Sequence, residues 1–136
     1  MYLLDSSAWL VHLFEEPGVE QINQLFDDSE AEINISVLSV PEVYARLRAL
    51  GREENWSDVW NAYSAVFSNT LSADQTIAQQ AILLRANTPQ RLPTIDALIA
   101  ATAAVHGLIL VHRDSHLAAI PSAFVDQIQL PAQTFE

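Results

Sequence analysis

The sequence predicts an α/β fold in which helices cover both faces of a parallel sheet. Short apolar runs typical of buried strands recur along the chain, and segments with apolar residues every three or four positions separate them. No repeat, low-complexity tract or linker interrupts this order. The 136 residues, half of them hydrophobic, are expected to form one domain over 1–136 and leave no room for a second.

Five elements are expected in the first 51 residues. They are a strand over 2–4, a helix over 7–14, a helix over 19–26, a strand over 33–36 and a helix over 39–50. Ser6 or Ser7 could cap the first of these helices. Ser39 stands three residues before Glu42, which is the spacing of a capping box, and Gly51 would end the last helix.

The second half of the chain is expected to be richer in helix. Its elements are helices over 56–67 and 74–87, a helix over 94–106, a strand over 108–111, a short helix over 115–119 and a weaker strand over 124–130. Pro89 and Pro93 mark a loop before the helix over 94–106, which Thr94 could cap and Gly107 would end.

The composition excludes some classes of site and partner. There is no cysteine, which excludes disulfides and thiolate metal sites. Seventeen acidic residues against six arginines and no lysine give a net charge of −11. Nucleic-acid-binding proteins usually carry a basic surface, so most of these acids are interpreted as a solvated face. Three arginines, Arg46, Arg48 and Arg52, cluster and could form a local basic rim.

We expect a cytoplasmic protein that does not enter a membrane. The chain reaches Asp5 within one short strand, without the basic start and apolar core of a signal peptide. Its longest apolar stretch, 97–111, is interrupted by Thr102, His106 and Gly107. The stretch is also shorter than the roughly 20 residues that a bilayer requires.

Four carboxylates stand where a parallel sheet would gather them at one edge. Asp5 and Asp114 each follow an expected strand, whereas Glu42 and Asp96 fall in the first turns of expected helices. Open parallel sheets bind ligands outside the carboxyl ends of their strands. Two like charges about 4 Å apart repel by roughly 4 kcal/mol at an effective dielectric near 20, so gathered acids need a cation. A hard divalent metal is the simplest one.

Each acid taken alone also has a structural interpretation. Asp5 and Asp114 could cap the helices that follow them, and Glu42 could complete the capping box of Ser39. The helix dipole favours Asp96 in a first turn by about 0.3 to 1 kcal/mol. Independent caps, however, have no reason to fall at successive strand ends on one side of a sheet. The joint pattern therefore favours a site.

The histidines and tryptophans give weaker signals. His112 and His116 flank Asp114 and could touch a phosphate or a leaving group, although ordinary polar roles are the simpler interpretation. The three tryptophans are expected to anchor a core or an interface, with base stacking as the alternative.

Four motifs occur in a fixed order along nearly the whole chain. They are LLDSSAW with Asp5 and Ser7, SVLSVPEVYAR with Glu42, LPTIDALIAATA with Asp96, and LVHRDSHL with Asp114. This ordered set resembles the PIN domain family, in particular VapC-like toxins of bacterial toxin-antitoxin pairs. The resemblance implies a three-layer α/β/α sandwich with a parallel sheet of about five strands. It also implies a Mg²⁺- or Mn²⁺-dependent ribonuclease, usually a homodimer, that acts on RNA and is inhibited by a small antitoxin.

The resemblance also assigns roles to residues. Asp5, Asp96 and Asp114 would be direct or water-mediated metal ligands. Glu42 would be a further ligand or would orient the attacking water, and Ser7 would fix a carboxylate or a metal-bound water. Such a metal lowers the pKa of a bound water and neutralises charge on the scissile phosphate.

An antitoxin could inhibit such a site by inserting an Arg or Lys among the acids, because a guanidinium pairs well with carboxylates. The helix that carries Val43, Leu47 and Leu50, with Trp9 nearby, is expected to offer a groove for its hydrophobic anchors.

Two other functions stay open on the sequence alone. A phosphatase of the haloacid dehalogenase type also starts with an apolar strand that ends in Asp. That chemistry requires a second acid two residues later, where Ser7 stands, and a lysine, which this chain lacks. A catalytically silent binding module could instead use the acids to hold a partner's arginines. Metal binding and metal-dependent cleavage would separate this module from a nuclease.

Overall fold

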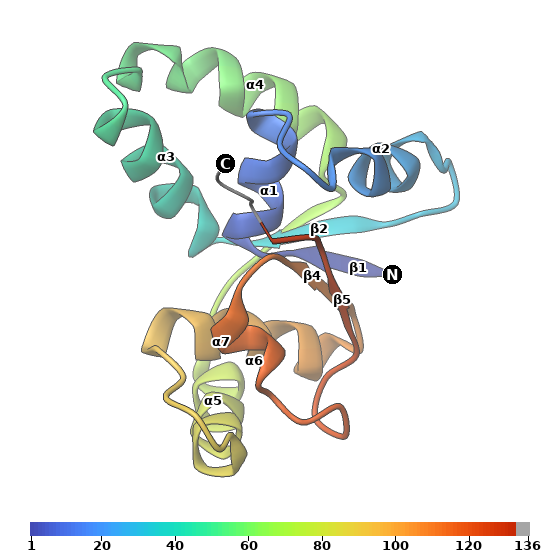
Figure 1. Ribbon diagram of the computed structural model, residues 1–136, viewed down its shortest axis with the longest axis vertical. Coiled ribbons are helices and arrows are strands. Elements are labelled where there is room, and N and C mark those ends of the chain that lie inside the picture. Colours follow the sequence, from blue (N-terminus) through green and yellow to red (C-terminus); the bar gives the residue numbers. More distant parts are fainter. Residues whose placement is uncertain (133–136) are drawn as a thin grey trace.

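Residues 1–132, which the computed structural model describes, contain one sheet of five parallel strands in the order β3-β2-β1-β4-β5 (Figure 1). The strands are β1 (Tyr2–Leu4), β2 (Ile33–Ser36), β3 (Asn69–Leu71), β4 (Ile109–His112) and β5 (Gln127–Gln129). The domain was expected to extend to Glu136, and residues 133–136 lie outside the described part of the chain.

Helices connect the strands and cover both faces of the sheet (Figure 1). One face carries α1 (Ser6–Leu13), α2 (Val19–Asp27), α3 (Ser39–Ala49) and α4 (Trp56–Val66), with a 3-10 turn at Glu53–Asn55. The other face carries α5 (Gln75–Asn87), α6 (Thr94–His106) and α7 (Ser115–Ala118). The prediction of a three-layer α/β/α sandwich with about five parallel strands is confirmed. Among these described helices, none is long and apolar enough to cross a membrane.

The central strands are apolar on both faces because each face is covered by helices. Leu3 and Leu110 are partners in register and pack in the core beneath α5 and α6. The next pair along the strands, Leu4 and Val111, packs in the core beneath α1 and α3. This alternation follows from the pleat of a strand, which points successive side chains to opposite faces. It creates two separate hydrophobic cores, one on each side of the sheet.

Two strands differ from the prediction. The edge strand β3 was missed, because its three residues, Asn-Thr-Leu, are mostly exposed and carry no apolar alternation. The last strand was expected over 124–130, but only Gln127–Gln129 pairs with β4. Phe124 lies instead in a turn, in which its N–H donates to the Pro121 carbonyl at 3.0 Å.

The predicted serine and threonine helix caps are wrong. Helix α1 begins at Ser6, and the cap is Asp5, whose side chain accepts the Ser7 N–H. Ser39 and Thr94 are each the first residue within their helix, and neither α3 nor α6 has a side-chain cap. Asp5 as a helix cap was one of the interpretations weighed from the sequence, and Asp114 likewise caps α7.

Candidate functional site

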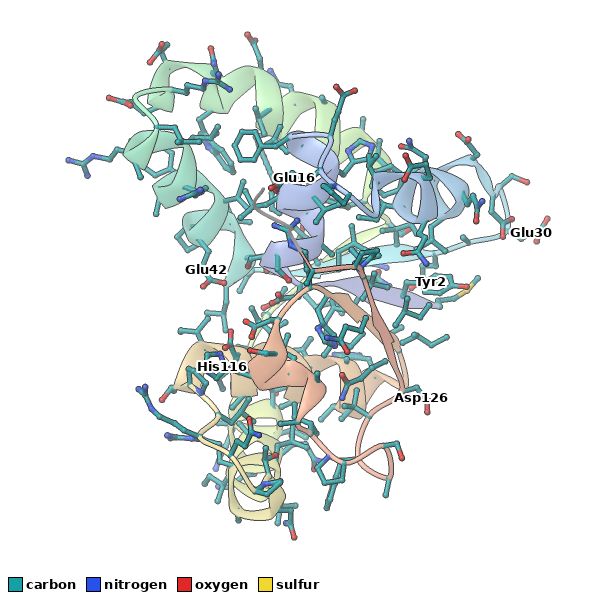
Figure 2. All side chains as sticks on the ribbon, in the orientation of Figure 1. Tyr2, Glu16, Glu30, Glu42, His116 and Asp126 are labelled. Atoms are coloured by element: carbon teal, nitrogen blue, oxygen red, sulfur yellow. The ribbon has the colours of Figure 1, made fainter. Side chains whose placement is uncertain are left out.

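The carboxyl edge of the sheet gathers all four predicted acids. Asp5 directly follows β1, and Asp114 lies two residues after β4. Glu42 and Asp96 lie in the first turns of α3 and α6, which begin at the same edge. Figure 2 shows Glu42 and His116 on the same side of the molecule, with Glu42 above His116 in this view. The topology thus places these groups at the position where open parallel sheets bind ligands.

The four carboxylates form one electrostatic unit. Burial, followed by the charges of Asp114, Asp5 and Glu42, raises the pKa of Asp96 to about 7. Burial also raises the pKa of Asp5, against the lowering effect of its hydrogen bonds to Ser7, and Asp114 raises it further. The pKa of Glu42 is raised in the same way, by burial first and then by Asp5 and Asp114. Such mutual shifts are typical of sites that lack a compensating positive charge.

Ser7 holds the carboxylate of Asp5. The Ser7 hydroxyl donates to Asp5 Oδ2 at 2.6 Å, and the Ser7 backbone N–H donates to the same oxygen at 3.1 Å. The Ser7 hydroxyl oxygen in turn accepts the backbone N–H of Arg113 at 2.9 Å. Because Arg113 precedes Asp114, this chain of hydrogen bonds ties the end of β1 to the turn after β4.

Ser6 holds Glu42 and is itself in contact with Ser39, and neither contact was predicted from the sequence. Ser6 Oγ lies 2.6 Å from Glu42 Oε1 and 2.9 Å from Ser39 Oγ. A hydroxyl has one proton, so Ser6 donates to the carboxylate and accepts from Ser39. The capping-box interpretation of Ser39 and Glu42 is therefore wrong, because Ser6 engages both side chains. Ser39 and Glu42 are three residues apart whether they form a capping box or both contact Ser6. Their spacing in the sequence therefore could not distinguish the two arrangements.

The two histidines that flank Asp114 have different surroundings. His112 is fully buried. Its Nδ1 accepts the Asp114 backbone N–H at 3.1 Å, and its Nε2 lies 2.6 Å from Gln127 Oε1. Both ring nitrogens are thus used to hold the turn after β4. The half-exposed His116 instead faces the acids, with Nδ1 3.2 Å from Asp114 Oδ1 and 4.0 Å from Asp96 Oδ2.

Three of these side chains lie close enough together that they could hold one metal ion. Asp96, Asp114 and His116 each offer a ligand atom, and the three atoms lie within 4.8 Å of one another. Two oxygens and one nitrogen suit a divalent cation. Asp5 lies near enough to influence the pKa of Asp96 but does not belong to this close group.

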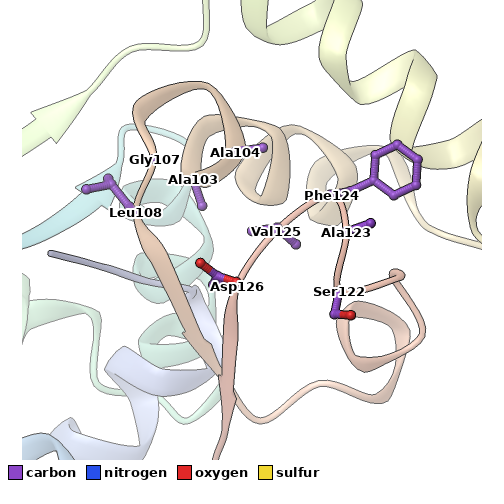
Figure 3. A pocket seen from close by; sticks show the side chains of 9 residues that line it. All are labelled: Ala103, Ala104, Gly107, Leu108, Ser122, Ala123, Phe124, Val125 and Asp126. Atoms are coloured by element: carbon purple, nitrogen blue, oxygen red, sulfur yellow. The ribbon is translucent and has the colours of Figure 1, made fainter.

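A small cavity at the opposite edge of the sheet does not share this chemistry (Figure 3). It has a volume of about 170 Å³ and lies where β4 and β5 begin, beside Gly107, Leu108 and Asp126. Asp126 is the one carboxylate among its lining residues, and several of the others are alanines. One charge without convergent partners does not make a candidate active site.

The burial of side chains on α3 corrects one expectation about how an antitoxin would bind. The predicted hydrophobic groove along α3 is wrong, because Val43 and Leu47 are buried in the core and only Leu50 is exposed. The three clustered arginines, Arg46, Arg48 and Arg52, are exposed, as a basic rim would require.

Comparisons with known proteins agree with this fold. The family model of the PIN domain matches residues 2–122. The structure of VapBC2 from Rickettsia felis, bound to a promoter DNA fragment, gives a TM-score of 0.77 at 15% identity and covers 96% of this chain and 98% of that chain.

Two further solved structures cover nearly the whole chain. A toxin-antitoxin complex from Klebsiella pneumoniae gives a TM-score of 0.68 at 25% identity, over 95% of this chain and 97% of that one. VapC20 from Mycobacterium tuberculosis, described as a sarcin-ricin loop cleaving toxin, gives 0.69 at 15% identity, over 92% and 97%. A search of curated proteins found no match. Because the family model spans most of the sequence, the chain belongs to the PIN domain family.

Proposed function

We propose that this protein is a divalent-metal-dependent ribonuclease and the toxin of a type II toxin-antitoxin pair. The observation that carries the proposal is the convergence of Asp5, Glu42, Asp96 and Asp114 at one edge of the sheet, where burial and then mutual repulsion raise the pKa of Asp96 to about 7. Membership of the PIN domain family supports it. The description of VapC20, a chain of the same fold, as a sarcin-ricin loop cleaving toxin supports the choice of RNA.

In this proposal Asp5, Asp96 and Asp114 hold a Mg²⁺ or Mn²⁺ ion directly or through water. The bound ion would supply an activated water and neutralise charge on the scissile phosphate. Ser7 keeps Asp5 turned toward the site through its two hydrogen bonds. Glu42, held by Ser6, is a further ligand or orients the attacking water. The chain thus needs no serine, cysteine or histidine nucleophile.

We propose an antitoxin, a second copy of the chain and an RNA substrate as the partners, in the cytoplasm. The solved structures of the same fold include VapBC and FitAB assemblies, which supports an antitoxin. A basic antitoxin side chain would find its carboxylates at the acid cluster, because a guanidinium stays charged when buried and pairs with two oxygens. Its hydrophobic anchors would have to lie elsewhere than along Val43 and Leu47, which are buried.

The test is RNA cleavage by Asp5→Asn, Asp96→Asn and Asp114→Asn, each assayed with Mg²⁺ and with Mn²⁺. We expect each variant to lose at least about a hundredfold in rate, the order seen when one electrostatic group of an active site is removed. Asp126→Asn makes the same chemical change at the opposite edge and should keep wild-type activity.

Circular dichroism must be unchanged in all four variants for the comparison to hold. Full cleavage by any two of the three site variants would contradict the carboxylate mechanism. If wild type binds the metal but cleaves no RNA, the silent binding module is the better account.

A further inference from the structure

A nitrogen atom stands among the oxygens of the acid cluster. His116 Nδ1 faces two carboxylates of different elements, at 3.2 Å from Asp114 Oδ1 and 4.0 Å from Asp96 Oδ2. Its side chain is half exposed, so burial does not force this orientation. The backbone N–H of His116 also donates to Asp114 Oδ1 at 2.8 Å, which fixes the start of α7 and keeps residue 116 beside the acids whatever side chain it carries.

The other three histidines of the chain do not offer a nitrogen to this site. His112 uses both ring nitrogens in hydrogen bonds to Asp114 and Gln127. His12 lies on α1 against Tyr63, with Nδ1 2.6 Å from the phenol oxygen. His106 is exposed at the far end of α6, ten residues and about 15 Å of helix from Asp96. Among the four, His116 alone faces the acid cluster.

The distances at His116 suit a single ion. An octahedral ion with ligands at about 2.1 Å holds neighbouring ligand atoms about 3.0 Å apart and opposite ones about 4.2 Å apart. The separation of 3.2 Å from His116 Nδ1 to Asp114 Oδ1 is close to the first value, and that of 4.0 Å to Asp96 Oδ2 is close to the second. All three ligand atoms lie within 4.8 Å of one another. One ion between Asp96, Asp114 and His116 would therefore need little movement of the side chains.

We propose that His116 is a direct nitrogen ligand of the metal in this site, and that it makes the site favour Mn²⁺ over Mg²⁺ more strongly than its carboxylates alone would. The inference rests on the proposed function, because it assumes that the acid cluster holds a divalent ion. Mg²⁺ prefers oxygen ligands and gives up its waters reluctantly, so an imidazole adds little to its binding. First-row transition ions accept imidazole readily. The nitrogen therefore contributes to Mn²⁺ binding and hardly to Mg²⁺ binding.

The experiment combines pulsed electron paramagnetic resonance of bound Mn²⁺ with calorimetric titration of Mn²⁺ and Mg²⁺. It compares wild type with His116→Gln and with His116→Asp, which replaces the nitrogen by an oxygen ligand. His106→Gln is the matched control, because it removes an exposed histidine away from the acids. All readouts use the bound metal itself and none depends on cleavage.

We expect a directly coordinated ¹⁴N signal in wild type and in His106→Gln, and none in either His116 variant. The Mn²⁺ affinity of His116→Gln should fall about tenfold, whereas its Mg²⁺ affinity should change less than twofold. His116→Asp should still bind Mn²⁺, without the nitrogen signal and with its preference moved toward Mg²⁺. A ¹⁴N signal that survives in His116→Gln, or Mn²⁺ bound to wild type without one, would overturn the inference and leave the proposed function standing. If wild type binds neither ion, the metal site itself fails, and the proposed function with it.

Discussion

The hydrophobic cores on the two faces of the sheet are made of different kinds of side chain. On the α1, α3 and α4 face, the fully buried Trp9 stands among four other aromatic rings, with centroids 5.1 to 6.3 Å from its own. Those rings belong to Trp56, Trp60, Tyr63 and Phe67. On the α5, α6 and α7 face, the fully buried hydrophobic residues of the described chain are aliphatic, and four of them are alanines of α6. One core is filled by large rings, and the other by the close approach of helices.

The acids of the candidate site come from both faces. Asp5 caps α1 and Glu42 lies on α3, which both pack on the aromatic core. Asp96 lies on α6 and Asp114 caps α7, which both pack on the aliphatic core. The candidate site therefore lies at the boundary between the two cores, and its geometry depends on both. Damage to either core should displace two of the four acids.

Removing the central ring of the aromatic core should have the largest effect on stability. We expect Trp9→Ala to lower the free energy of unfolding by about 3 to 5 kcal/mol, because it leaves a cavity that the neighbouring rings cannot fill. Domains are typically stable by only about 5 to 15 kcal/mol. Urea denaturation measures the change, and a loss below about 1 kcal/mol would show that the ring cluster is not the core of this face.

The aliphatic face should respond to added volume rather than to its loss. Ala100 is fully buried on α6, so Ala100→Leu forces extra methylenes between closely packed elements. We expect a loss of about 1 to 3 kcal/mol, the usual cost of overpacking. Val105→Leu, at an exposed position near the end of the same helix, is the control and should be nearly neutral. Equal stability of the two variants would mean that α6 does not pack as closely as described.

The sequence predicts the central strands and most helices well, because their apolar residues have a clear period. It misses β3, whose three residues sit at an exposed edge where no burial pattern is required. For the site, the positions of Asp5, Glu42, Asp96 and Asp114 follow from strand ends and helix starts. The hydrogen bond from Ser6 to Glu42 joins residues 36 positions apart. The approach of His116 to Asp96 likewise depends on how α6 and α7 pack. No local pattern encodes contacts of this kind.

The burial of the four acids and their mutual repulsion should appear in the pH dependence of the metal-free protein. The pKa of Asp96 is raised from 3.8 to about 7, so between these values the folded protein holds a proton that the unfolded chain has lost. The free energy of unfolding should therefore fall as the pH rises from about 4 to 7. Above pH 7 the ionisation of Asp96 should cause no further change. The pKa shifts of Asp5 and Glu42 act in the same direction.

Urea denaturation across this pH range measures the slope. Asp96→Asn should flatten it, because the asparagine cannot ionise, and Asp126→Asn should leave it unchanged. A slope in Asp96→Asn as steep as in wild type would assign the effect to other groups.

The smallest effect is expected from the serine pair that holds Glu42. Ser39→Ala removes the donor to Ser6 and should lower kcat for RNA cleavage about fivefold, which corresponds to about 1 kcal/mol, the net worth of one hydrogen bond. KM should change little, because the substrate is not contacted. Ser39→Thr keeps the hydroxyl and should restore most of the rate. An unchanged kcat in Ser39→Ala would show that Ser6 positions Glu42 without help.

The central claim, that acids from both faces share one metal ion, is tested most directly by the melting temperature with and without Mn²⁺. An ion that binds only the folded state stabilises it by about 2.7 kcal/mol at a hundred times its dissociation constant. Millimolar Mn²⁺ should therefore raise the Tm of wild type and of Asp126→Asn. The rise should be much smaller in Asp5→Asn, from the aromatic face, and in Asp96→Asn, from the aliphatic face. A Tm that Mn²⁺ leaves unmoved in wild type and in Asp96→Asn alike would contradict the claim that these acids form a metal site.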